Sequence, residues 1–221
     1  MPRAMRSDPE LGAALQGLAP VGQDAVPRGC GFDKAGRPPP MKVLSLFRKN
    51  PRREAIESLY QRTAAASREP SLYLDLGIPD SVEGRFEAVT LHIILVLRRL
   101  SGLPDPAGEV AQDLVDCFFR HLDASLRELA VGDLAVPKRM KKLGEAFTGR
   151  SLAYQRALDT VDGDLAATLA RNVLGESEPA HRLASYVRDS EAELSAQNLE
   201  DLLREGPRFP PPPARREGDR P

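Results

Sequence analysis

Three side chains that bind metals or take part in catalysis recur every four positions along one segment. Asp113, Cys117 and His121 would share one face of a helix, where a thiolate and an imidazole could both contact one metal ion. A structural zinc ion needs four ligands, and the sequence offers no second Cys/His pair to complete the set. We interpret this stripe as a helix flank that packs a buried thiol, and we expect no metal site and no cofactor.

Other catalytic patterns are missing from the sequence. It contains no Gly-x-Ser-x-Gly motif, no phosphate-binding glycine-rich loop and no His-Glu-x-x-His. Of the remaining histidines, His92 is expected to be a hydrogen-bonded structural residue and His181 to be exposed. We therefore expect a protein that binds a partner and is not an enzyme. A helical enzyme of the isoprenoid or quinone type stays as an alternative, although the Asp-rich magnesium motifs of such enzymes are absent.

A cluster of positive charge lies in the block Val131–Arg150, at the start of a predicted helix. Its neighbouring cations are Lys138, Arg139, Lys141 and Lys142. At 100° per residue, Lys138 and Lys142 point away from the apolar stripe of this helix, whereas Arg139 and Arg150 lie together on its border. Border arginines can pack their stems on a core and present guanidinium groups to carboxylates, phosphates or a partner surface. The charge alone leaves a solvated face and a binding face open.

Two further features of the same block suggest contact with a partner. Gly144 and Gly149 lower helix stability, so they indicate close approach of another backbone or of a partner. Asp133 lies in the connection Val131–Pro137 that precedes the helix. We include Asp133 with the four cations and Arg150 among the predicted partner-binding residues.

The elements that position these residues are predicted to be helices. Capping residues, helix-breaking Gly and Pro, and apolar spacing predict helices over about 51–67, 70–76, 81–101, 106–129 and 137–158. Asp162 or Asp164 caps a further helix that Gly175 closes, and residues 178–205 hold one or two more. No segment predicts a strand. The fold class is therefore all-α, a single compact multi-helix domain.

The predicted helix 81–101 is apolar around most of its circumference. Its wide apolar arc contains Phe86, Val89, Ile93, Ile94, Val96, Leu97 and Leu100. Leu91 and Leu95 project from the opposite side. A helix of this kind is normally a central core helix. The alternative is that Leu91 and Leu95 line an exposed groove that binds an apolar segment of a partner.

Composition divides the chain into a helical domain and two tails. The domain is expected over residues 41–205, and a disordered Pro/Arg-rich tail over 206–221. Residues 1–40 are either a disordered arm or sequence upstream of a working start at Met41. The net charge of −1 excludes a globally basic nucleic-acid binder. Two cysteines cannot form a disulfide framework, and a reducing compartment fits them.

Apolar runs are too short for targeting or for a membrane span. Residues 1–40 lack an apolar stretch of secretory length, and the longest run, Val89–Leu97, is far short of the ~20 residues that cross a bilayer. We expect the protein in the cytoplasm.

Several ordered motifs resemble those of the ubiquinol–cytochrome c chaperone family. The segments that carry the resemblance are residues 71–86, Leu91-His92 with Arg98-Arg99, residues 126–150 and Arg171–Gly175. The strongest match is Val131-Gly132-Asp133-Leu134 followed by Pro137-Lys138-Arg139-Met140-Lys141-Lys142 and Ala146-Phe147-x-Gly149-Arg150. The resemblance covers about residues 51–175, and we expect the regions before and after to lie outside it.

The resemblance implies an assembly factor for the cytochrome bc1 complex. The Arg/Ala/Pro-rich composition indicates a bacterial member, which would act in the cytoplasm, free or peripheral on the inner membrane. Relatives are understood to bind newly made cytochrome b, with a small partner protein, near the ribosome, so the expected client is cytochrome b or another bc1 subunit. The basic block would then meet anionic lipid, ribosomal RNA or polar loops of the client, and no DNA partner is expected. A helical ribosome-, RNA- or lipid-binding module is the alternative function.

Overall fold

The computed structural model describes residues 51–128, 136–159, 164–175 and 180–213. These residues belong almost entirely to the unit Arg52–Pro221, which is described here by itself. They form helices and contain no strand, so the all-α prediction is confirmed for this part of the chain. The elements are α2 (Pro51–Ala66), α3 (Pro70–Leu74), α4 (Val82–Ser101), α5 (Ala107–Glu128), α6 (Val136–Asp159), α7 (Leu165–Leu169), the π-helical turn η2 (Ala170–Leu174), α8 (His181–Ser195) and α9 (Leu199–Arg204).

Capping residues place the helix ends close to where the sequence predicts them. The Ser81 hydroxyl accepts a hydrogen bond from the Gly84 amide at 3.1 Å and begins α4. Asp164, the second of the two predicted caps, accepts from the Ala167 amide at 2.8 Å and begins α7. Gly175 closes η2 in the left-handed conformation, with φ of 70°. The helix that the sequence predicts over 164–174 is therefore one α-helical and one π-helical turn.

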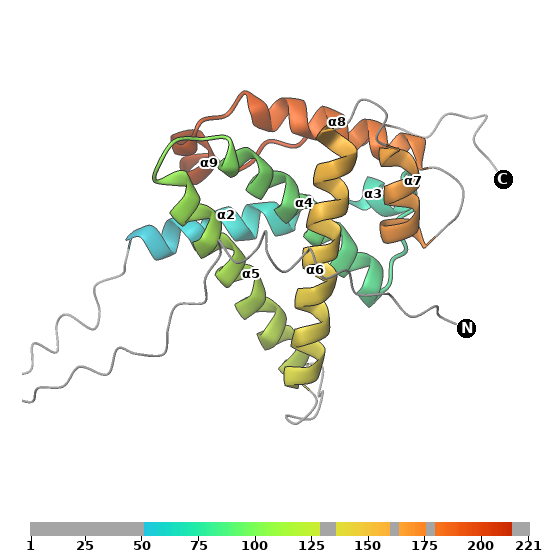
Figure 1. Cartoon of the computed structure of the whole chain (residues 1–221), viewed down its shortest axis with the longest axis horizontal. Helices are drawn as coiled ribbons and strands as arrows, with labels where there is room; N and C mark the ends of the chain where they lie inside the picture. The colour runs from blue at the N-terminus through green and yellow to red at the C-terminus, as the bar shows by residue number, and fades with distance from the viewer. Residues whose placement is uncertain (1–50, 129–135, 160–163, 176–179, 214–221) are drawn as a thin grey trace, which may run out of the picture. The chain divides into compact units, whose positions relative to one another are not determined.

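Helix α4 is the central element of the domain and contacts α5, α6, α8 and η2. Figure 1 shows α6 and α8 crossing beside α4, while α5 and α6 run next to each other toward a common end. Leu91 and Leu95 are 0% and 2% exposed, so both lie in the core. The central-core interpretation of this helix is confirmed. The alternative was wrong about these two leucines, because helices cover α4 on that side as well.

Helix α4 also carries a buried histidine with two hydrogen-bond partners. The Ala88 carbonyl accepts a hydrogen bond from His92 Nδ1 at 2.8 Å, which leaves Nε2 to accept from the Tyr186 hydroxyl at 2.7 Å. Burial lowers the pKa of His92 to about 4, so the ring is neutral at physiological pH. His92 is the structural residue that the sequence predicts, and it connects α4 to α8. His181 is exposed, also as predicted.

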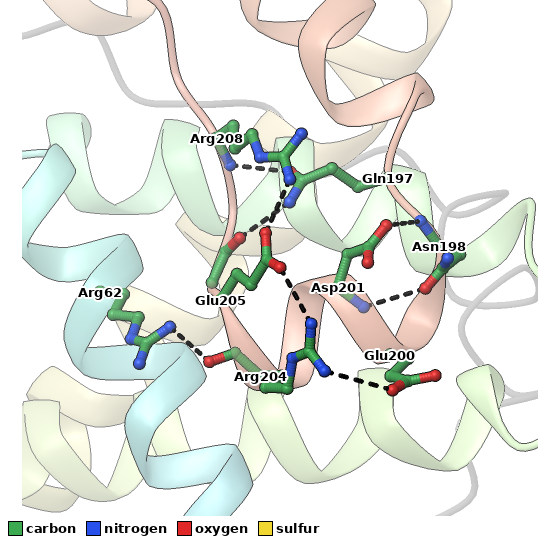
Figure 2. Close-up of polar contacts among 9 residues, drawn as sticks. Arg62, Gln197, Asn198, Glu200, Asp201, Arg204, Glu205 and Arg208 are labelled. Carbon is green, nitrogen blue, oxygen red and sulfur yellow. Dashed lines mark hydrogen bonds and ion pairs between the residues drawn. The ribbon is translucent and has the colours of Figure 1, made fainter.

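The segment after α9 packs against the helices. The Gln197 side chain is fully buried, donates to the Gly206 carbonyl at 2.9 Å and accepts from the Arg208 amide at 2.7 Å (Figure 2). Phe209 contacts the His92 ring edge-on, with a centroid distance of 4.7 Å. The Pro213 carbonyl accepts from Arg182 at 2.7 Å. The prediction of a disordered tail from residue 206 is therefore wrong for residues 206–213, because Gln197 and Phe209 hold this segment in place.

Candidate functional site: an apolar groove with a basic rim

An apolar groove of about 650 Å³ lies where α2, α3, α4, α5 and α6 meet. We define the apolar groove by its apolar lining, which consists of Tyr60, Tyr73, Val82, Phe86, Val89, Leu122, Leu126, Leu143 and Ala146. Val82 is 65% exposed, an unusual value for a large apolar side chain. A partly open hollow with such a lining is a typical binding site for an apolar ligand or peptide side chain.

The start of α4 is held beside the groove by a close backbone contact. A Cβ atom at Gly84 would lie 1.9 Å from the carbonyl oxygen of Pro79, so only glycine fits there without a backbone shift. With Ser81 as N-cap, this contact sets the direction in which α4 leaves the preceding loop. Phe86 and Val89, one and two helical turns after Val82, line the groove. The position of the groove wall thus depends on a small residue outside the lining.

Positive side chains lie along the edge of the apolar groove. Arg68, Arg139 and Lys142 line it and are exposed, and we call these three residues the basic rim. Within the described residues, neither Arg139 nor Lys142 takes part in an ion pair. Arg85 also lines the groove, but its guanidinium pairs with Asp80 at 2.7 Å. The basic rim can therefore bind carboxylates or phosphates of a molecule seated in the groove.

One ion pair connects α4 to α6 at the groove, which Glu87 also lines. Arg150 donates from Nε and Nη2 to the two carboxylate oxygens of Glu87, in a bidentate arrangement. The side chains are 17% and 11% exposed. Burial raises the pKa of Glu87, and the hydrogen bonds from Arg150 oppose this effect. Arg150 is therefore occupied within the domain, whereas Arg139 remains available at the surface.

The predicted partner-binding residues thus fall into distinct groups. Arg139 and Lys142 lie at the groove, and Lys138 and Lys141 are exposed on the same helix without lining it. Asp133 lies outside the described residues. Arg139 and Arg150 both lie on α6, but their guanidinium groups have different surroundings.

The described residues of this chain do not make the close approach predicted at Gly144. A Cβ at Gly144 would meet no atom within 4 Å among the described residues. The position is therefore open to a partner, which was the second alternative predicted for this glycine.

Sequence reasoning missed some of the groove. Leu122, Leu126 and Glu87 were not singled out as site residues. Leu122 and Leu126 are only partly buried because α5 extends past the central part of the core. The available signal in the sequence was an apolar residue, Val82, directly after the predicted N-cap Ser81. The structure shows that this side chain is exposed near the start of α4.

Comparison with known proteins places these helices in a family. The family model for the ubiquinol–cytochrome c chaperones matches residues 74–209. The chain belongs to this family. The match begins later than the resemblance found in the sequence and continues through α8, α9 and Phe209. The expectation that the family region ends near Gly175 is thus wrong, because the later helices complete the same core.

A solved structure gives the same result. The crystal structure of the Cbp3 homolog from Brucella abortus is 41% identical, with a TM-score of 0.62, and the match covers 73% of this chain and 92% of that chain. No curated protein matched. Family membership supports the expected chaperone or assembly-factor role for ubiquinol–cytochrome c reductase. In the part of the chain that the structure describes, no helix combines the length and apolar character that a membrane span requires.

Proposed function

We propose that this protein is a non-catalytic assembly chaperone of the cytochrome bc1 complex that holds an apolar segment of newly made cytochrome b. The observation that carries the proposal is the apolar groove with its basic rim, most of whose lining residues lie in the region that matches the chaperone family. A membrane protein that has left the ribosome exposes apolar surface to water, and covering that surface is favourable.

The dimensions of the groove limit what it holds. A volume of about 650 Å³ admits several side chains, whereas a membrane-spanning helix of ~20 residues is about 30 Å long. The groove therefore holds one or two turns of the client segment, and the basic rim pairs with carboxylates in the polar loop at its end. This division assigns apolar recognition mainly to α4 and α5, and charge recognition to the start of α6 together with Arg68.

The test compares the two rim cations on α6 with two cations on the same helix that do not line the groove. The tagged full chain carrying Arg139→Glu with Lys142→Glu is expressed in a respiring host, and the cytochrome b that co-purifies is quantified. We expect a loss of about tenfold or more, because two attractive contacts become repulsive. The matched control is Lys138→Glu with Lys141→Glu, which changes the net charge equally on the same helix and should retain the client.

A second variant tests the apolar part. Leu126→Asp places a carboxylate in the lining and should reduce capture, with helical content unchanged by circular dichroism. If both charge-reversed proteins lose binding equally and binding falls steeply with salt, the recognised partner is RNA or an anionic membrane surface and the proposal fails. Undiminished capture by Arg139→Glu with Lys142→Glu and by Leu126→Asp would also refute the groove as the client site.

A further inference from the structure

A second cluster of reactive side chains joins α2 to α5. Glu57 comes from α2, and Cys117 and His121 come from adjacent turns of α5. Glu57 Oε1 lies 2.7 Å from His121 Nε2, and Cys117 Sγ donates to Glu57 Oε2 at 3.4 Å. All three possible ligand atoms lie within 4.8 Å of one another.

We propose that Glu57, Cys117 and His121 form a binding site for a zinc ion, with a fourth position open to solvent. Thiolate sulfur, imidazole nitrogen and carboxylate oxygen are the donors that zinc binds in proteins, and three protein ligands with one open position are a common arrangement. Tetrahedral coordination at usual zinc bond lengths separates ligand atoms by about 3.3–3.6 Å. Small side-chain rotations bring the present cluster to that spacing.

The sequence pattern grouped Asp113 with Cys117 and His121, but Asp113 is not part of the cluster. Asp113 accepts from Arg52 at 2.6 Å and takes no part in the cluster. Its place is taken by Glu57, which lies 60 residues before Cys117 in the chain. The objection to a metal site was the lack of further Cys or His ligands, and a carboxylate from α2 answers part of it.

Neighbouring side chains orient the imidazole of His121 and favour the ionised form of Glu57. The Tyr60 ring stacks on His121 with a centroid distance of 4.2 Å, which fixes the orientation of the imidazole. The pKa of Glu57 is lowered, chiefly by a hydrogen bond from Gln61, so it is an ionised carboxylate at neutral pH. Arg120 lies 3.5 Å from Glu57 and competes with a cation, but its side chain is half exposed and can move into solvent.

Zinc binding must displace a proton. Burial is the main cause that raises the pKa of the Cys117 thiol to about 11, so the thiol is protonated in the free protein. The bound form contains the thiolate, so zinc binding releases the thiol proton. Cys117 itself is buried, while His121 and Glu57 are about one-third exposed, so the metal enters from their side.

The site would also stiffen one wall of the apolar groove. Tyr60 stacks on His121 and lines the groove, and Leu122 follows His121 in α5. A metal ion between α2 and α5 holds these two lining residues at a fixed separation.

The experiment titrates the full chain with Zn²⁺ and with Co²⁺, a spectroscopic substitute. The parent protein carries Cys30→Ser, so that Cys117 is its only thiol. We expect one ion per chain, a thiolate-to-cobalt charge-transfer band, and release of at least one proton per zinc ion by calorimetry in buffers of different ionisation enthalpy. Cys117→Ser should remove the band and weaken zinc binding at least about 100-fold.

Two partly exposed ligands keep the test decisive if Cys117→Ser fails to fold. His121→Gln and Glu57→Gln should each weaken zinc binding at least about tenfold, with unchanged circular dichroism. Asp113→Asn is the matched control on the same helix face and should bind like the parent. The proposal is overturned if the parent shows no charge-transfer band, or if the glutamine variants bind zinc as tightly as Asp113→Asn does.

Discussion

Replacement of Arg150 by methionine tests how the buried ion pair supports the domain. In Arg150→Met the stem of the side chain keeps most of its packing, but Glu87 remains in a site where its side chain is 11% exposed. Removing one partner of a buried pair leaves an uncompensated charge, which costs roughly 3–5 kcal/mol. Because 1 kcal/mol shifts Tm by about 2–4 °C in a chain of this length, we expect a fall of roughly 6–20 °C.

Urea unfolding at pH 7.5 measures the free energy of unfolding, and heating at the same pH measures Tm. Both are followed by far-ultraviolet circular dichroism. Lys138→Met removes an exposed charge from the same helix and should change the free energy of unfolding by less than ~0.5 kcal/mol. Glu87→Leu with Arg150→Met removes both charges, and a buried pair replaced by apolar side chains is often nearly neutral. The double variant should therefore recover most of the stability that Arg150→Met loses.

The pH dependence checks the cause of the effect. Burial already raises the pKa of Glu87, and loss of Arg150 raises it further. A carboxyl group with a raised pKa in the folded state binds more protons there than in the unfolded state, so its contribution to stability is present at low pH and lost as pH rises through the folded pKa. The difference between the native protein and Arg150→Met should shrink from pH 7.5 to pH 5.

The reasoning is refuted by either of two results. One is that Arg150→Met costs no more than Lys138→Met. The other is that its cost is the same at pH 5 and pH 7.5, which would mean that lost packing and not an unpaired charge causes the effect.

Two further predictions concern glycines and the C-terminal segment. Gly84→Ala should destabilise the protein by about 1–3 kcal/mol because the new Cβ meets Pro79, whereas Gly144→Ala, where space is open, should stabilise it by ~0.5–1 kcal/mol in thermal unfolding. The glycine argument would be contradicted by equal effects. Gln197→Leu removes the partners of the Gly206 carbonyl and the Arg208 amide and should cost roughly 2–4 kcal/mol. Limited proteolysis by trypsin should then cut after Arg208 much faster, and an unchanged cleavage rate would show that this segment is held by other contacts.

Local signals explain how much of the fold was predictable. Ser81 and Asp164 act within three residues of their own positions, so the sequence predicts both helix starts. The packing of residues 206–213 was not predictable, because it depends on Gln197 and His92, which are distant in sequence or buried only after the helices assemble. Proline content correctly indicates that no helix continues there, but it does not show whether the segment packs.

The candidate site was predicted in part for the same reason. The charge pattern singles out Lys138, Arg139, Lys141 and Lys142 alike, and the structure puts only Arg139 and Lys142 at the groove. The sequence cannot show that Arg150 forms an ion pair within the domain, because Glu87 is 63 residues away and lies on another helix. It also cannot tell a stripe that covers the core from one that continues beyond it, as in the case of Leu126.

The bond between His92 and Tyr186 has a consequence for biosynthesis. Its two partners are separated by 94 residues, and Phe209 adds to the same contact from still later in the chain. At synthesis rates of 5–20 residues per second, roughly 5–19 s pass between the translation of the two partners. During that time α4, the most apolar helix of the domain, emerges without its covering helix. The apolar surface of α4 is thus exposed to water until α8 has been translated and can cover it.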